Sequence, residues 1–444
     1  MKLTKIITLA AVAAALPALA LAQDGPTGPA TDEVKWILTS LLFLIGGFLV
    51  FWMAAGFAML EAGLVRSKNV TMQLIKNISL FSIAAIMYYL LGYNLMYPLG
   101  DWAIEFYFSG LFGSVGVLES VGVGYDAVDD AGYASTSSDY FFQLMFCATT
   151  ASIVSGTLAE RIKLWPFLIF TAVLTGFIYP LTASWQWGGG FLSEAGFSDF
   201  AGSTVVHACG GAAALAGAIL LGSRIGKYDS AGRVVPMPGS NLALATLGTF
   251  ILWLGWFGFN GGSQLAMGTV SDIADVGRIF ANTNTAAAGG AVAALILSAV
   301  LYKKPDLTMV LNGALAGLVS ITAEPLTPTL GSATLIGAVG GVIVVLTVPM
   351  LDKMKIDDVV GAIPVHFIAG FWGTMAVPLT NDGAAFGTQL LGFVSIVGAT
   401  FVLSFVVFLI LKLIMGIRVS EEAEIEGLDM AELGMEAYPD FTRS

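Results

Sequence analysis

Long apolar segments separated by short polar ones organise this chain. Most of the apolar segments are close to the ~20 residues that a helix requires to cross the hydrocarbon core of a bilayer. The pattern therefore predicts an all-α polytopic membrane protein with eleven transmembrane helices. The predicted spans are 36–60, 70–92, 140–159, 164–183, 203–222, 241–259, 278–302, 307–323, 331–350, 359–378 and 386–415.

The eighth and ninth spans are short, and their separation depends on Pro325 and Pro328, which mark a turn between them. We find no run of alternating apolar and polar residues of the kind that a lipid-facing strand shows, so the pattern excludes a β-barrel.

The N-terminus has the pattern of a secretory signal peptide over residues 1–22. Lys2 and Lys5 precede a short apolar core, and Ala20-Leu21-Ala22 forms a small-x-small cleavage site. The alternative is an uncleaved first membrane helix, but Pro17 and the short core argue against it. We therefore expect the mature N-terminus on the exported side.

Basic residues gather in alternate loops and so predict the orientation of the chain. If the N-terminus is exported, the odd-numbered spans lead inward, and the loops after them hold nearly all of the Lys and Arg. One missed span would invert this arrangement downstream, so the charges support eleven spans with the N-terminus outside and the C-terminus inside. The inside loops hold Arg66, Lys68, Arg161, Lys163, Arg224, Lys227, Arg233, Lys303, Lys304, Lys353 and Lys355.

Composition agrees with this class and excludes others. Of 444 residues, 57% are hydrophobic and 11% are charged, whereas a soluble domain has about 25% charged residues. Such a chain lacks the polar side chains to cover a soluble surface, which excludes a cytosolic enzyme, a nucleic-acid binder and a disordered protein. Cys147 and Cys209 lie in apolar runs without ligand spacing, so we expect neither a disulfide framework nor a zinc site.

The spans divide into two groups of five, each ending in a span with one histidine. The surrounding strings are Val206-His207-Ala208-Cys209-Gly210-Gly211 and Val365-His366-Phe367-Ile368-Ala369-Gly370, and both contain V-H-x-x-x-G. Five is odd, so the halves would have inverted topology, with span eleven added at the end. Inverted repeats are a recurrent transporter architecture, with the pathway at the repeat interface.

His207 and His366 are the only histidines of the chain. A histidine inside a membrane is costly unless it is paired or lines a polar path. An interhelical hydrogen bond is the alternative, but corresponding positions in both halves favour a function. Two facing neutral rings can share a proton or pass one along. No further intramembrane Cys, Asp or Glu completes a ligand set, so we expect no metal and no other cofactor.

A second cluster is aromatic and maps to the outer half of the membrane. Phe146, Trp187, Trp256 and Phe259 belong to it, and Ser263 follows in Asn260-Gly261-Gly262-Ser263. Aromatic faces attract cations, and a serine oxygen can accept a hydrogen bond from an ammonium-like N–H. The alternative is the aromatic belt of any membrane interface, which position alone favours.

We assign structural roles, as a helix cap or as part of a loop, to the acidic residues near the spans. Asp199 precedes His207 by eight residues, and a carboxylate there would cap the start of span five. A direct cation ligand is the alternative for this residue. We assign Glu61 and Glu160, near inner ends of spans, to the basic inner loops and not to a pathway.

These residues resemble the ammonium transporter (Amt/Mep/Rh) superfamily, bacterial Amt type, over essentially the whole mature chain. The main match runs from Asp199 through Val205-Val206-His207 and Gly210-Gly211 to Arg224. Further matches are Phe142-Gln143-x-x-Phe146, Ala159-Glu160-Arg161-Ile162, Trp256-Phe257-Gly258-Phe259-Asn260 and Asp357-Asp358 leading to Pro364-Val365-His366.

The resemblance implies a homotrimer of eleven-helix subunits in the cytoplasmic membrane, each subunit with its own ammonium pore. It implies no catalytic residues. The expected roles are ammonium recruitment by Trp187, Phe146 and Ser263, a vestibule carboxylate in Asp199, a phenylalanine gate of Phe146 and Phe259, a pore lined by the twin histidines His207 and His366, and support from Trp256 and Gln143.

The expected transporter domain covers residues 23–415, and a cytoplasmic acidic tail covers 416–444. By charge alone the tail would be disordered, but Ile425, Leu428 and Leu433 are interleaved with the acids and suffice to dock short helices. In the family this tail contacts the inner loops and couples to a PII signalling protein. By charge, its docking surface would be Lys303, Lys304, Lys353 or Lys355.

Two alternative functions stay open at this point. One is conduction of another small amine or gas through the same fold, with methylammonium as a surrogate substrate. The other is an ammonium sensor that binds but conducts little. An enzyme is the least favoured class, because we find no nucleophile–base pair and no metal set in the sequence.

Overall fold

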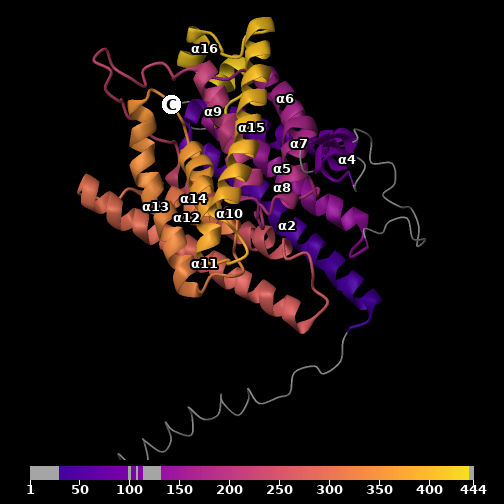
Figure 1. Cartoon of the computed structure of the whole chain (residues 1–444). Helices are drawn as coiled ribbons and strands as arrows, with labels where there is room; N and C mark the ends of the chain where they lie inside the picture. The colour runs from indigo at the N-terminus through magenta and orange to yellow at the C-terminus, as the bar shows by residue number, and fades with distance from the viewer. Residues whose placement is uncertain (1–29, 99–101, 107–108, 114–131, 440–444) are drawn as a thin grey trace, which may run out of the picture.

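The computed structural model describes residues 30–98, 102–106, 109–113 and 132–439. Figure 1 shows these residues as a bundle of helices packed side by side, with α16 at the end of the bundle opposite to the start of α2. The predicted signal peptide and the last acid of the tail, Asp440, lie outside the described residues.

Each predicted span corresponds to a helical segment. Eight helices among the described residues are long and apolar enough to cross a membrane, and two further apolar helices are shorter. The count of eleven spans and their orientation stay predictions. The segments are α2 (Asp32–Leu64), α3 (Val70–Met87) with η2 (Tyr88–Gly92) and α4 (Tyr93–Met96), α5 (Thr136–Thr157), α6 (Leu164–Val173) with η3 (Leu174–Ile178) and α7 (Tyr179–Ser184), η4 (Ser203–Ala208) with α9 (Cys209–Leu221), α10 (Leu242–Gly262), α11 (Val270–Tyr302), α12 (Leu307–Thr322), α13 (Leu330–Lys353), η5 (Ile363–Ile368) with α14 (Ala369–Ala376) and η6 (Val377–Leu379), and α15 (Phe386–Ile414).

Short elements connect or follow these helices. Two of them, β1 and β2, pair as an antiparallel hairpin that the hydrophobic pattern did not predict. The short elements are η1 (Ser67–Asn69), β1 (Trp102–Phe106), β2 (Ser109–Gly113), α8 (Phe191–Glu194), α16 (Glu421–Glu426) and η7 (Asp429–Leu433).

Helix caps explain where the structure departs from the predicted boundaries. We predicted the seventh span from residue 278, but α11 begins at Val270. Thr269 and Asp272 form a capping box there: Asp272 N donates to Thr269 Oγ1 (3.1 Å), and the Asp272 carboxylate accepts from Thr269 N (2.8 Å). Two orphan N–H groups are thereby satisfied, so the helix continues beyond its apolar part.

Glycines let α2 and α10 pack closely, which fixes the element that carries Trp256 and Phe259. A Cβ added to Gly248 would lie 2.4 Å from Leu60 N and 2.6 Å from Gly56 O. Only glycine fits such an approach, which is how membrane helices gain van der Waals contact.

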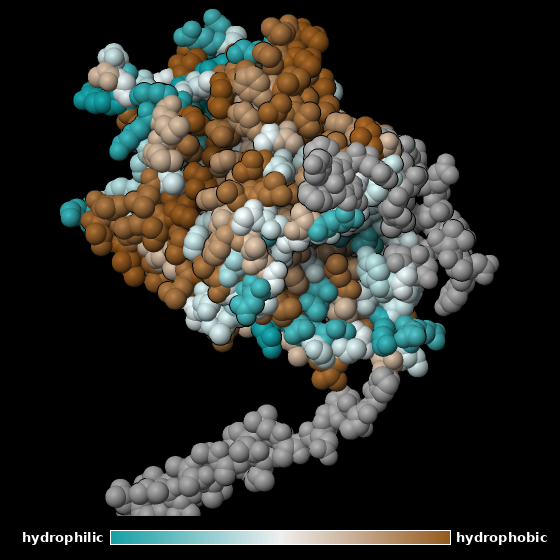
Figure 2. Space-filling view, viewed as in Figure 1, coloured by the Kyte–Doolittle hydropathy of each residue, from teal (hydrophilic) through white to brown (hydrophobic). Residues whose placement is uncertain are grey.

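The outer surface of the bundle is apolar. Figure 2 shows hydrophobic atoms over α13 and the upper part of α15, with hydrophilic atoms at the ends of the bundle. Leu335, Leu413 and Ile414 are 69%, 77% and 78% exposed. A soluble protein rarely leaves so continuous an apolar face in water, so the surface fits a multi-pass membrane protein.

Candidate functional site: a line of rings through the bundle

The site begins in a cavity of about 140 Å³ at the ends of α5 and α10. The predicted orientation places these ends outside, so we call it the outer cavity. Ser263 Oγ donates to Phe259 O (2.8 Å), so its lone pairs are left to accept from a ligand. Trp187 Nε1 donates to Asp199 O (3.0 Å), which fixes the indole at the cavity wall. The lining residues are Tyr97, Tyr133, Gln143, Phe146, Trp187, Phe200, Ser263 and Leu265.

Two stacked phenylalanines separate this cavity from the interior. Phe146 and Phe259 are buried, and their ring centroids are 4.0 Å apart. Phe146 meets Trp187 edge-on at 6.0 Å, and Phe259 stacks on His207 at 5.2 Å. The rings therefore run without interruption from the outer cavity to the first histidine.

The two histidines contact each other directly. His207 Nδ1 and His366 Nδ1 are 3.2 Å apart, so one of these nitrogens must carry the proton while the other accepts it. Trp256 stacks on His207 at 4.8 Å and donates its Nε1–H to Thr322 Oγ1 (2.8 Å). His207 Nε2 is buried and has no hydrogen-bond partner in the part of the chain that the structure describes.

Matching local structure presents the two histidines. Each lies on a π-helical segment, η4 or η5, followed by an α-helix. The Asp199 carboxylate accepts four backbone N–H groups at the start of η4, from residues 202 to 205, at 2.8–3.1 Å. Asp358 accepts from Gly361 N (3.2 Å) and Ile363 N (2.7 Å) at the start of η5.

Asp199 and Asp358 each precede their histidine by eight residues. Asp199 does not line the outer cavity, and its hydrogen bonds are those of a cap. Gly202, with φ +104°, supplies the left-handed turn that brings the backbone over this carboxylate.

Beyond the histidines, on the side that the predicted orientation places inside, the line of rings meets two cavities, which we call the inner cavities. His366 lines a cavity of about 20 Å³, which shares Asn312 and Val360 with a cavity of about 360 Å³. Glu61 also lines the smaller cavity. Our assignment of Glu61 to the basic inner loops is therefore wrong: it lies on α2, and its side chain turns into the bundle, where it is 1% exposed.

The chain is similar to known proteins over most of its length. The model of the Ammonium Transporter Family matches residues 41–438. The chain belongs to this family. Ammonium transporter Amt2 of Archaeoglobus fulgidus is 43% identical over 428 residues, which cover 90% of this chain and 87% of the relative. Ammonium transporter Amt1 of Haloferax mediterranei is 39% identical and covers 90% of this chain and 78% of the relative.

Solved structures of the family share the fold. A protein described as a Sensor Amt Protein has a TM-score of 0.82 at 34% identity, covering 91% of this chain and 100% of the other. Mep2 of Candida albicans has a TM-score of 0.76 at 25% identity, covering 92% and 91%. The resemblance read from the motifs is thereby confirmed, and the chain is a multi-pass membrane protein of a transporter family.

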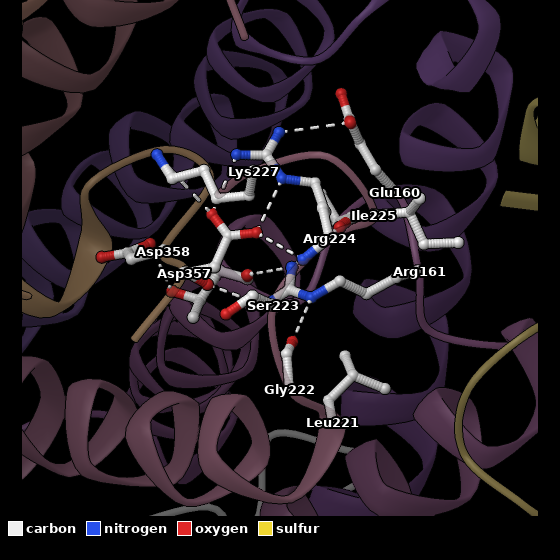
Figure 3. Close-up of polar contacts among 12 residues, drawn as sticks. Glu160, Arg161, Leu221, Gly222, Ser223, Arg224, Ile225, Lys227, Asp357 and Asp358 are labelled. Atoms are coloured by element: carbon white, nitrogen blue, oxygen red, sulfur yellow. Dashed lines mark hydrogen bonds and ion pairs between the residues drawn. The ribbon is translucent and has the colours of Figure 1, made fainter. Parts of the chain in front are cut away.

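A buried ion-pair network surrounds the inner mouth of this family member (Figure 3). Arg224 lies between Asp357 (Nε–Oδ2 2.8 Å) and Glu160 (Nη1–Oε2 3.2 Å). Glu160 also pairs with Arg66 (2.6 Å), so its assignment to the inner loops agrees with the structure. Arg161 donates to Asp357 O (2.6 Å) and Gly222 O (2.8 Å).

Charge and burial oppose each other in this network. Burial alone would raise the pKa of Asp357, but the hydrogen bonds and charges of Arg224 and Arg161 hold it well below its usual range. The pKa of Glu160 is also lowered, because the charges and hydrogen bonds of Arg224 and Arg66 outweigh the effect of burial. Both carboxylates are therefore ionised at neutral pH, and they fix the loops around the inner cavity.

The described part of the tail docks on the start of α3, on the loop before it and on the loop that follows α9. Glu424 accepts from Ile225 N (2.6 Å) and pairs with Arg418 (2.8 Å). Asp429 accepts from the backbone N–H groups of residues 71 and 72 at 3.0 and 2.8 Å, at the start of α3. Leu428 is fully buried, and Lys68 Nζ donates to the carbonyl oxygens of residues 424 and 425.

This docking surface corrects the prediction by charge. The tail contacts that the described residues show lie around Lys68 and in the loop of Ile225, whereas the prediction by charge had placed them at Lys303, Lys304, Lys353 or Lys355. Of the apolar tail residues, Leu428 is buried and Leu433 packs against the core, but Ile425 is 59% exposed. Besides Lys68 Nζ, the partners of the tail are backbone N–H groups at the start of α3 and at Ile225, and backbone donors cannot be recognised by counting lysines.

Sequence reasoning assigned no role to three contributors to the site, although Asp358 stands in one of the quoted motifs. Asp358 could have been found, because its spacing to His366 repeats that of Asp199 to His207. Tyr97 and Tyr133 line the outer cavity, but they lie in a segment without motif or apolar period. Only packing brings them there.

Proposed function

We propose that this protein carries ammonium inward across the cytoplasmic membrane. Ammonium binds at Trp187, Phe146 and Ser263, gives up a proton to water in the outer cavity, and moves as ammonia past Phe259 along the twin histidines. The released proton either returns to the outer solution or crosses separately, and the current measurement below decides between these routes. The observation that carries the proposal is the uninterrupted line of rings from the outer cavity to the imidazole pair, with Nδ1 atoms 3.2 Å apart.

The outer cavity offers what an ammonium ion requires. The faces of Trp187 and Phe146 attract a cation by about 0.5–2 kcal/mol. The Ser263 oxygen accepts one N–H, since its own hydrogen is donated to Phe259 O. Asp199 acts indirectly, because its carboxylate holds the turn that carries the Trp187 hydrogen bond.

The interior favours the neutral species. Transfer of a bare ion into a medium of low dielectric costs tens of kcal/mol by Born estimates, before relaxation. Ammonia avoids most of that cost and can exchange hydrogen bonds with imidazole. One Nδ1 carries the proton between the two rings. The Nε2 atom of that same ring is then an acceptor, and an N–H of neutral ammonia can donate to it.

Reconstitution tests the proposal. We expect purified protein in liposomes to raise ammonium permeability over protein-free liposomes. A current during an ammonium jump shows that the proton crosses as well, whereas alkalinisation without current shows passage of ammonia alone. Equal permeability of both liposome preparations, with folded and inserted protein, would overturn the transport function.

A sensor is the second candidate, since one solved relative is described as a Sensor Amt Protein at 34% identity. A sensor would bind ammonium with little flux. Ammonium-dependent changes in tryptophan fluorescence, measured on the protein used for the flux assay, separate the two functions.

We infer from the family resemblance that three subunits associate and that the inner face binds a PII signalling protein. The apolar faces of the bundle suit contacts with lipid and with other subunits. Native mass spectrometry tests the homotrimer, and co-purification with PII at defined nucleotide concentrations tests the partner. We expect methylammonium to serve as a surrogate substrate in both flux and binding assays.

A further inference from the structure

Asp139 is a buried carboxylate in the first turn of α5, the helix that also carries Gln143 and Phe146. Its exposed fraction is 3%. Residues four and seven positions apart share one face of a helix, so Asp139 stands on the same face as Gln143 and Phe146. Both of these residues line the outer cavity. The carboxylate therefore lies one helical turn from the wall of that cavity.

Two residues of the cavity wall also contact this carboxylate. Tyr133 Oη donates a long hydrogen bond to Asp139 Oδ1 (3.4 Å), and the side chain of Gln143 lies beside the carboxylate. A third residue, Tyr93, donates a short hydrogen bond from its Oη to Oδ2 (2.6 Å). Hydroxyl donors of this kind stabilise the ionised form of a buried acid.

Asp139 has no basic partner within residues 30–98, 102–106, 109–113 and 132–439. The basic residues on the predicted outer side pair with other acids. Lys35 Nζ lies 3.0 Å from Asp32 Oδ1, and Arg278 Nη1 lies 4.0 Å from Asp275 Oδ1. A buried charge without a counterion is costly. A cation held in the adjacent cavity would reduce that cost.

Asp139 differs in this respect from Asp199, the other acid near the cavity. The Asp199 carboxylate accepts four backbone N–H groups at the start of η4, at 2.8–3.1 Å, and these dipoles offset its charge. Among the described residues, the hydrogen bonds to Asp139 come from side chains and from no backbone N–H. The charge of Asp139 is therefore the less compensated of the two.

We propose that Asp139 supplies the negative charge that raises the affinity of the outer cavity for ammonium. The carboxylate does not touch the ion, and its field acts across Tyr133 and Gln143 at the cavity wall. This role rests on the proposed transport function and adds to it a residue that determines cation affinity. The aromatic faces and Ser263 orient the ligand, and Asp139 favours a cation over a neutral molecule of the same size.

Asp139→Asn tests this role, because it keeps the shape of the side chain and removes the charge. We expect the half-saturating ammonium concentration to rise on the order of tenfold, the effect of two unit charges separated by one side chain at a protein surface. Maximal flux should change little, since the interior of the pathway is untouched. Flux through liposomes and ammonium-dependent tryptophan fluorescence measure the two quantities on the full chain.

The variant leaves no basic residue unpaired, so it should fold. If it does not, Asp139→Ser, which is also uncharged, is judged by the same measurements. Asp139→Glu keeps the charge and changes the shape, so its half-saturating concentration should stay closer to wild type than that of Asp139→Asn.

Glu324→Gln is the matched control for the loss of a buried acid on the predicted outer side. Glu324 is 7% exposed and accepts from Asn381 Nδ2 (2.6 Å) and Thr327 N (3.2 Å). It does not line the outer cavity. We expect its half-saturating concentration to equal that of wild type.

The outcomes separate the two proposals. Wild-type protein without flux overturns the transport function itself. Wild-type flux with an unchanged half-saturating concentration in the folded, uncharged Asp139 variants overturns the role of Asp139 alone. An equal rise in Asp139→Glu, which would indicate shape, or in Glu324→Gln, which would indicate any outer acid, overturns it as well. A rise confined to the uncharged Asp139 variants, with maximal flux retained, supports it.

Discussion

The proton between His207 and His366 can lie on either Nδ1, and this exchange depends on both rings. His207→Ala or His366→Ala leaves the remaining imidazole without its 3.2 Å partner. We expect either variant to insert and fold but to lose ammonium flux or its selectivity over other cations. Flux of ammonium and of potassium in matched liposomes is the measurement.

The control for the histidine variants is ammonium binding at the outer cavity, which neither histidine lines. This binding should persist in both. Unchanged rate and selectivity in both single variants would show that the imidazole pair is structural.

Trp187 provides the second test at the scale of single residues. Trp187→Leu removes an aromatic face worth roughly 0.5–2 kcal/mol to a cation, so the half-saturating ammonium concentration should rise and discrimination among cations should weaken. Trp165→Leu is the control, because Trp165 is 67% exposed on the outside of the bundle. If the uptake curves of the two variants coincide, Trp187 is an ordinary interfacial tryptophan.

The motifs predicted which aromatic and histidine side chains would lie together, but they did not predict every residue that surrounds them. Phe146, Trp187, Phe259 and both histidines meet as expected from their strings. Glu61 was assigned wrongly, because its position near a span end resembles that of any inner-loop acid. Whether it faces a loop or the pore depends on how α2 and α5 pack, and spacing in one segment does not contain that information.

At the scale of elements, the lengths of the apolar runs located the helical segments well, because a spanning helix must match the thickness of the bilayer. It located helix ends less well, since capping residues such as Thr269 and Asp272 extend helices into polar sequence. The π-helical segments η4 and η5 were not predicted. Their geometry depends on carboxylates that bind the first N–H groups, at Asp199 and Asp358.

The network of Arg224, Asp357 and Glu160 joins three inner loops, and its pH dependence follows from its charges. Both acids have a pKa lowered in the folded state, so their stabilisation is present above the unfolded pKa values of about 4. It is lost as the pH falls through the folded values. We expect the midpoint of thermal unfolding in detergent to be level near neutral pH and to fall below about pH 4.

Asp357→Asn should lower stability at neutral pH by about 3–5 kcal/mol, because it leaves the buried Arg224 charge less compensated. The variant should also lose less stability than wild type on acidification. Asp352→Asn is the control, since the Lys227–Asp352 pair (3.0 Å) is partly exposed and such pairs contribute ~0–1 kcal/mol. Equal unfolding midpoints for wild type and Asp357→Asn from pH 7 to pH 3 would contradict this account.

For the whole molecule, the outer and inner halves of the pathway have different chemistry. In the pathway that we propose, aromatic faces line the outer entrance, imidazoles occupy the middle, and carboxylates with their arginine partners surround the inner exit. This order suits a substrate that arrives as a cation, crosses as a neutral molecule and leaves into a polar vestibule. Regulation would act most directly where the tail meets the inner loops.

The tail can influence transport because its contacts reach the start of α3 and the loop of Arg224. Asp429 caps α3, Glu424 accepts from Ile225 N, and Leu428 is fully buried. Deletion after Gly416 removes these contacts but no spanning segment. We expect a membrane-inserted trimer with impaired flux and altered inhibition by PII.

Leu428→Ala should weaken the docking of the tail by about 2–5 kcal/mol, whereas Ile425→Ala, at an exposed position, should not. Flux with and without PII, together with protease sensitivity of the tail, distinguishes the variants. If the truncated protein matches the full chain in rate and inhibition, the docked tail has no regulatory role.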